Sequence, residues 1–137
     1  MTQEVSIPST WRTTAPRYRL TGSQCTQCDE LFFPPRSICL KCRAPTDNGF
    51  SFSGFGEVLT FTVINAAPAG FQKETPYVIG IIELEEGPRV TAQIVDIDPK
   101  DVSEGLQVQT AFRRYAAPPN TKSVITYGYK FVPRFSY

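Results

Sequence analysis

CTQC (residues 25–28) and CLKC (residues 39–42) are the two stretches that decide the fold of this 137-residue chain. They are separated by ten residues and contain all four of its cysteines. A CxxC turn directs both sulfurs at one centre, so two such turns brought together surround a point with four thiolates. That is the tetrahedral ligand set of a structural Zn²⁺ site. Because this spacing seldom arises twice by chance, the sequence predicts four metal ligands: Cys25, Cys28, Cys39 and Cys42.

Other chemistry is open to paired cysteines. A thioredoxin-type CxxC begins a helix after a strand, whereas these pairs lie in turn-rich sequence near Gly22 and Pro34-Pro35. A disulfide framework is typical of small secreted domains, and we see no apolar signal segment before the cysteines. Iron in a rubredoxin-type centre stays open, because Fe and Zn both accept tetrahedral sulfur. With four thiolates the metal has no open position, which indicates a structural role.

Composition indicates a folded chain with few means of catalysis. Hydrophobic residues make up 41% and charged residues 20%, and no apolar run approaches the ~18 residues that span a bilayer. We expect a soluble, cytoplasmic protein without membrane contact. The chain has no histidine, the commonest general acid or base near neutral pH. We therefore predict no catalytic residues on this chain.

Charge is distributed unevenly along the sequence. Residues 48–98 carry two basic and seven acidic side chains, whereas residues 1–47 carry six and four, and residues 99–137 six and two. A nucleic-acid-binding protein normally presents a basic stripe on its binding face. The acidic middle of the chain therefore argues against a nucleic-acid partner.

Alternating apolar residues after the cysteines predict a β domain. A short helical turn is expected over residues 98–105, and upstream we expect an extended arm over residues 1–10. Residues 11–20 are ambiguous: Ser9 and Thr10 could cap a short helix, but Pro16 would break it, and a short strand is expected over residues 17–20. We place the domain boundary after residue 47, with arm and ribbon over 1–47 and the second domain over 48–137. The fold class is mainly β, a rubredoxin-like Cys₄ zinc ribbon followed by a five-stranded OB-fold barrel. Its strands are predicted over residues 57–64, 77–84, 89–95, 107–114 and 124–132.

Four segments carry a resemblance to a known family: YRLTGSQCTQCDELFFPPRSICLKC (18–42), SGFGEVLTFTVI (53–64), PYVIGIIEL (76–84) and EGLQVQTAF (104–112). Together they resemble the zinc-ribbon/OB-fold acyl-CoA-associated proteins that accompany thiolase-like enzymes. The opening WRTTAPRYRLTGSQC (11–25) is similar to bacterial thiolase partners such as the small subunit of benzoylsuccinyl-CoA thiolase. The resemblance implies a non-catalytic subunit in a hetero-oligomer with a thiolase-like chain. That chain would hold the nucleophilic cysteine and its histidines, and acyl-CoA would be bound jointly.

Five further residues are candidates for binding. Arg113, Arg114 and Lys122 are predicted contacts for CoA phosphates, since basic side chains near a loop suit that ligand; a solvated rim is their plain alternative. Trp11 and Phe71 are predicted partner contacts; for Trp11 the alternative is that it anchors the arm on the ribbon. Phe71 stands in the loop over residues 65–76, where we expect no apolar neighbours to bury it.

Two alternative functions remain at this stage. An OB barrel can bind single-stranded nucleic acid by stacking bases on aromatic side chains. Between residues 77 and 95, however, Tyr77 is the only aromatic residue. A rubredoxin-like iron electron carrier would use the same four cysteines.

Overall fold

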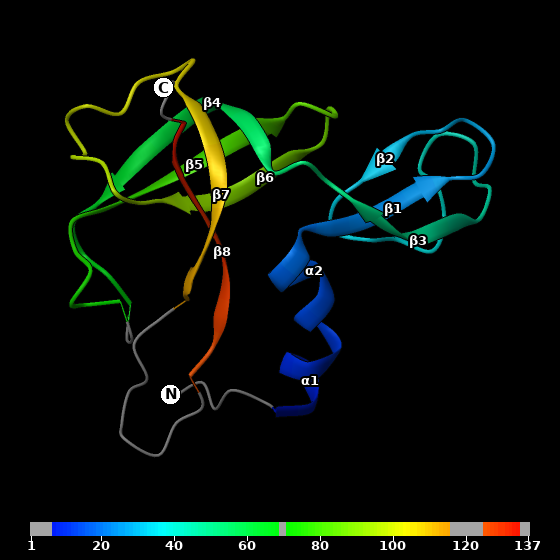
Figure 1. The fold of residues 1–137 in the computed structure, drawn as a ribbon, viewed down its shortest axis with the longest axis horizontal. Helices are drawn as coiled ribbons and strands as arrows, with labels where there is room; N and C mark the ends of the chain where they lie inside the picture. Colours follow the sequence, from blue (N-terminus) through cyan, green and yellow to red (C-terminus); the bar gives the residue numbers. More distant parts are fainter. Residues whose placement is uncertain (1–6, 69–70, 116–124, 135–137) are drawn as a thin grey trace.

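The computed structural model describes residues 7–68, 71–115 and 125–134. A small three-stranded sheet and a five-stranded barrel lie on opposite sides of the molecule, and two short helices lie below the region that joins them (Figure 1). The predicted fold class, mainly β with a four-cysteine ribbon before a five-stranded barrel, is confirmed.

The chain enters through two helices, α1 (Ile7–Arg12) and α2 (Thr14–Arg19). The expectation of an extended arm is therefore wrong for residues 7–10, and the strand expected over residues 17–20 is helical up to residue 19. Pro16 is the third residue of α2, in the first turn, where backbone N–H groups have no helical partner, so its missing N–H breaks nothing. Leu20 ends α2 in the left-handed conformation, with φ 49°. Within the described part of the chain, no helix is long and apolar enough to cross a membrane.

The ribbon is an antiparallel sheet of β1 (Thr21–Cys25), β2 (Leu31–Phe32) and β3 (Thr46–Ser51), in the order β2-β1-β3. The central strand ends on the first metal-ligand candidate, Cys25, whose register partner is Thr46. The outer strand β3 runs across the boundary predicted after residue 47, and the position of that boundary stays a prediction.

The barrel is closed, with strand order β4-β5-β6-β8-β7. Neighbouring strands are antiparallel except β6 and β8, which meet in parallel at Ile94 and Phe131. Residues of β5 alternate between the barrel interior and the surface over much of its length, as the sequence pattern predicts. The five strands are β4 (Phe55–Ile64), β5 (Tyr77–Leu84), β6 (Arg89–Ile94), β7 (Gln107–Arg114) and β8 (Tyr127–Pro133).

Of the helical turn expected over residues 98–105, the capped start is present: the Asp98 side chain accepts a hydrogen bond from the N–H of Lys100 at 2.9 Å. The rest of the segment forms a second tight turn and no helix. The N–H of Asp101 donates to the backbone carbonyl of Asp98 at 2.9 Å, but no helix follows. Gly105, with φ 84°, donates its N–H to the carbonyl of Val58 in β4 at 2.8 Å. This bond ties the backbone to the barrel in place of a further helical bond.

Residues at the ends of the ribbon sheet pack into the apolar core of the barrel. Leu20 and Phe52 flank the ribbon sheet in sequence, yet both belong to the buried cluster that fills the barrel. Phe33, which follows β2, meets Phe52 edge to face at 6.1 Å between ring centroids and Tyr129 of β8 at 5.8 Å. Aromatic contacts of this kind hold the ribbon against the barrel.

Candidate functional site

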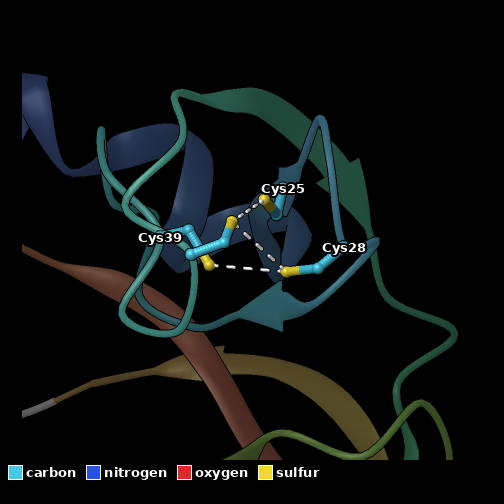
Figure 2. A group of neighbouring side chains, drawn as sticks. Cys25, Cys28 and Cys39 are labelled. Atoms are coloured by element: carbon cyan, nitrogen blue, oxygen red, sulfur yellow. Dashed lines mark hydrogen bonds between the residues drawn. The ribbon is translucent and has the colours of Figure 1, made fainter.

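The four cysteine sulfurs lie close together between the two CxxC turns. Figure 2 labels three of these side chains, Cys25, Cys28 and Cys39, which point toward one another. Their ligand atoms all lie within 4.8 Å of one another, and the Sγ atoms of Cys25 and Cys42 are 3.4 Å apart. Those of Cys28 and Cys39 are 3.6 Å apart. Zn–S bonds of about 2.3 Å in a tetrahedron give S–S edges of about 3.8 Å. The cluster therefore fits one tetrahedral metal ion with four thiolate ligands.

The two turns are built alike. We call residues 25–30 the first knuckle and residues 39–44 the second. In each, the N–H of the first cysteine donates to the carbonyl five residues later at 2.9 Å. The residue after the second cysteine, Asp29 or Arg43, is left-handed, with φ 55° and 60°. In each, the N–H two residues after the first cysteine donates to its sulfur, at 3.4 Å and 3.3 Å. The repeat explains how one CxxC spacing, used twice, produces four converging ligands.

The thiols of each knuckle differ in pKa. The pKa of Cys39 is lowered to about 6 and that of Cys25 is also lowered, chiefly by hydrogen bonds from the backbone N–H three residues later. For Cys28 and Cys42, a backbone N–H two residues later lowers the pKa. Hydrogen bonds with the neighbouring thiols and burial raise it by more, to about 12 for Cys28. Four thiolates this close repel one another without a cation, and a divalent metal removes that conflict.

A second feature lies where the helices, ribbon and barrel meet. We call it the seam cavity; its volume is about 720 Å³. Its lining comes from α2, the segment after β2, strands β5, β6 and β8, and the residues flanking β5 and β7. Among the described residues, five aromatic side chains contribute to the lining: Phe33, Phe71, Tyr77, Tyr115 and Tyr129.

Charged groups line the same cavity. Lys130 of β8 is only 5% exposed, and its Nζ lies 3.2 Å from Oε2 of Glu74. The same carboxylate oxygen accepts a hydrogen bond from Gln93 at 3.1 Å. Arg17 of α2 also lines the cavity, with its guanidinium carbon 5.6 Å from the centre of the Tyr115 ring.

Of the residues predicted for CoA phosphates, Arg113 and Arg114 do not line this cavity. Arg113 is ion-paired with Asp96 at 2.9 Å. Arg114 is exposed, and within the described ranges it has no carboxylate at salt-bridge distance. Lys122 lies outside the described residues. Their role stays a prediction.

The residues predicted for partner contact differ from each other. Trp11 on α1 is 75% exposed, which leaves its ring accessible. The expectation that Phe71 has no apolar neighbours is wrong, because its ring centroid lies 5.8 Å from that of Tyr77 and 6.3 Å from that of Tyr115. Tyr115 is distant in sequence, so the loop alone could not indicate this contact. Partner binding by Trp11 and Phe71 stays a prediction.

Sequence reasoning missed a group of exposed aromatic side chains. Tyr18 of α2 meets Phe112 of β7 edge to face at 5.0 Å, and Phe112 stacks on Tyr127 of β8 at 5.5 Å. The three residues are 40–52% exposed. Phe112 and Tyr127 belong to the last two strands, outside residues 77–95, and the aromatic residues of these two strands were the available signal.

Comparison with known proteins supports this architecture. Two family models match the chain, the rubredoxin-like zinc ribbon domain of ChsH2 over residues 12–47 and the C-terminal OB-fold domain of ChsH2 over residues 51–113. A solved structure titled Ltp2-ChsH2(DUF35) aldolase has the same fold, with a TM-score of 0.67 and 24% identity. The match covers 92% of this chain and 89% of that one.

Three curated relatives indicate the family. A DUF35 domain-containing scaffold protein of Methanocaldococcus jannaschii is 48% identical over 93% of this chain and 90% of the relative. A probable enoyl-CoA hydratase alpha subunit of Thermomonospora curvata is 31% identical over 72% of this chain and 30% of the relative. The benzoylsuccinyl-CoA thiolase subunit BbsA of Thauera aromatica is 33% identical over 55% of this chain and 51% of the relative. The resemblance stated from the sequence is thereby confirmed.

Proposed function

Because the chain belongs to the family of DUF35 domain-containing scaffold proteins, we propose that it is a zinc-binding accessory subunit of a thiolase-like acyl-CoA enzyme. The observation that carries this proposal is the closed cluster of all four cysteines in a chain without histidine. A metal bound by four thiolates has no open position for substrate. The chain thus lacks the usual activated thiol of acyl transfer, and the nucleophile belongs to a partner chain.

The names of two relatives indicate what kind of enzyme the partner chain belongs to. One relative is a subunit of benzoylsuccinyl-CoA thiolase, and another is a probable alpha subunit of enoyl-CoA hydratase. Both names describe one chain of a multi-subunit enzyme that acts on an acyl-CoA. We extend this arrangement to the present chain as a hetero-oligomer with a thiolase-like subunit in the cytoplasm.

We assign Zn²⁺ to the four-cysteine cluster. The residues fit the ion, since the sulfur separations match a tetrahedron of Zn–S bonds and no other ligand is required. The bound ion would hold the two knuckles together and take no part in the reaction. Metal analysis of the purified protein distinguishes it from iron: a colourless protein with about one zinc per chain supports the assignment, and a red-brown protein containing iron supports an electron carrier.

Acyl-CoA would be bound jointly with the partner. Arg114 is better placed than Arg113 to bind a CoA phosphate. Arg113 already forms an ion pair with Asp96, whereas Arg114 has none in the described part of the chain. Lys122 is the third cation of this proposal. An arginine side chain can form a bidentate pair with phosphate, which suits such a contact.

The test is to identify the partner and then reconstitute the pair. The tagged full-length chain is purified from its native host, and accompanying proteins are identified by mass spectrometry. We expect a thiolase-like chain in fixed stoichiometry, no activity from the present chain alone, and acyl-CoA thiolysis by the reconstituted pair. Thiolase activity from the present chain alone, or a stable partner unrelated to acyl-CoA enzymes, would contradict the proposal.

A second candidate function has one observation in its favour. The exposed cluster of Tyr18, Phe112 and Tyr127 offers ring faces on which bases of single-stranded nucleic acid could stack. Filter binding of single-stranded DNA and RNA at low salt tests it. We expect no tight binding, in keeping with the acidic middle of the chain; tight binding that weakens steeply with salt would favour this second function.

A further inference from the structure

The seam cavity has the size and walls of a small-molecule site. Its volume of about 720 Å³ falls within the range of about 300–1,000 Å³ that is typical of ligand pockets. Two pairs of aromatic side chains in its lining brace each other: Phe33 with Tyr129 at 5.8 Å, and Phe71 with Tyr115 at 6.3 Å. Rings held by such contacts form apolar walls in the free protein, suited to a flat or apolar molecule.

A buried cation in the cavity has unused hydrogen-bonding capacity. The side chain of Lys130 is 7% exposed, so more than nine-tenths of it is buried. A lysine ammonium has three N–H donors, and Glu74 accepts from one of them. The other two have no protein acceptor among the residues that the structure describes. The same oxygen of Glu74 also accepts a hydrogen bond from Gln93, so the carboxylate divides its hydrogen-bonding capacity between Gln93 and Lys130.

A second cation lines the cavity without an anionic partner. Arg17 has no carboxylate within 4 Å in residues 7–68, 71–115 and 125–134. Its guanidinium lies over the ring of Tyr115, and its stem passes so close to Gly128 that a Cβ there would lie 2.8 Å from the Arg17 Cγ. The side chain is therefore held in place by packing, while its charge stays available to a ligand.

We propose that the seam cavity binds an organic anion, a carboxylate or phosphate attached to an aromatic or otherwise apolar body. Arg17 and Lys130 hold the charged end, and the aromatic side chains enclose the body. Charge-assisted hydrogen bonds of this kind are short and strong. The site is formed by this chain alone, so it stands independently of the thiolase partner proposed above.

Binding to the full-length, metal-loaded protein tests the proposal. The probes are 3-phenylpropanoate, its neutral amide and coenzyme A, each titrated by calorimetry. We expect saturable binding of at least one of the two anions. If phenylpropanoate binds, its neutral amide should bind at least about tenfold more weakly. Binding of phenylpropanoate alone assigns the charged end to a carboxylate, and binding of CoA alone assigns it to a phosphate. No saturable binding of either anion, or equal binding of acid and amide, overturns the proposal.

A matched pair of variants locates the site. Arg17→Gln should weaken binding of the anion by about tenfold or more. Arg134→Gln serves as the control, because Arg134 likewise lies over an aromatic ring, that of Phe55 at 4.4 Å, but does not line the cavity. Circular dichroism confirms that each variant is folded. Equal affinity of Arg17→Gln and the unaltered protein, or an equal loss in both variants, would show that the anion does not bind in the seam cavity.

Discussion

The ribbon and the barrel are each stabilised by a different kind of interaction. The ribbon buries Cys25, Cys39 and Ala44 as its own cluster, with Phe32 packed beside them. Among the described residues, the barrel cluster contains twelve buried apolar residues, nine of them on strands of the barrel. Apolar burial scales with domain size, and a sheet as small as the ribbon cannot supply enough of it. The metal must therefore provide in the ribbon what apolar packing provides in the barrel.

This difference concerns the source of stability, and it does not separate the two parts in space. Leu20 and Phe52 lie next to the ribbon in sequence but belong to the barrel cluster. Phe33, between the two knuckles, rests on Phe52 and on Tyr129 of the barrel. A substitution that destabilises one part can therefore affect the other through a few aromatic contacts. The variants below measure how strongly the two parts are coupled.

The largest effect is expected from loss of a metal ligand. Cys39→Ala or Cys25→Ala should release the ion, unfold residues 21–51 and weaken assembly with the partner. A structural zinc supplies about 10–16 kcal/mol of apparent binding free energy in small metal domains. Metal content by mass spectrometry and hydrogen exchange resolved by segment measure the outcome. Strands β4 to β8 should keep more of their exchange protection than the ribbon.

Leu40→Ala is the matched control, because Leu40 follows Cys39 directly, is 66% exposed and offers no ligand atom. It should retain the metal and normal exchange protection. A Cys39→Ala protein that still bound one metal ion and protected β1 to β3 would refute the contrast between ribbon and barrel.

The sequence was most informative where one local rule determines the structure. Repeated CxxC spacing identifies the ligands, because each turn repeats the same backbone bonds. Alternation identifies strands such as β5, since one of its faces must be buried. Tyr18 and Leu20 also alternate with arginines, but there the pattern was misleading. Leu20 reaches the core by a left-handed turn at the end of α2, which alternation cannot reveal.

The cavity and the environment of Phe71 could not be predicted in this way. Phe71 contacts Tyr115, and Lys130 pairs with Glu74, across long stretches of sequence. Such neighbours are fixed only by closure of the barrel and by docking of α2 on it. The residue types of these positions gave no local signal of a shared site.

An intermediate effect is expected from a cavity in the barrel. Ile82 of β5 is fully buried, and Ile82→Ala should lower the free energy of unfolding by about 2–5 kcal/mol. Ile81→Ala is the control, because Ile81 is 39% exposed and should change stability by no more than about 0.5 kcal/mol. Urea unfolding and metal analysis measure both variants. If the ribbon is stabilised by its metal and the barrel by apolar packing, the Ile82→Ala variant should keep its metal under native conditions. Loss of metal that increases with the loss of stability would instead show that the ribbon depends on the barrel.

The smallest effect is expected at the junction of the two parts. A Cβ at Gly22 of β1 would overlap the carbonyl oxygen of Phe32 and the ring of Phe52. Gly22→Ala should therefore destabilise the protein by about 1–3 kcal/mol, the usual cost of overpacking. Gln24→Ala, in the same strand, removes atoms and adds none, so it serves as the control.

Hydrogen exchange in Gly22→Ala shows which part absorbs the strain. The Phe32 carbonyl lies in the ribbon sheet, whereas the Phe52 ring belongs to the barrel core. The carbonyl is backbone and cannot move without shifting β2, while a ring can turn. We therefore expect faster exchange in β1 and β2 and little change in β5 or β8. Equal acceleration in ribbon and barrel would mean that Phe52 transmits the strain, and that the two parts unfold as one cooperative unit.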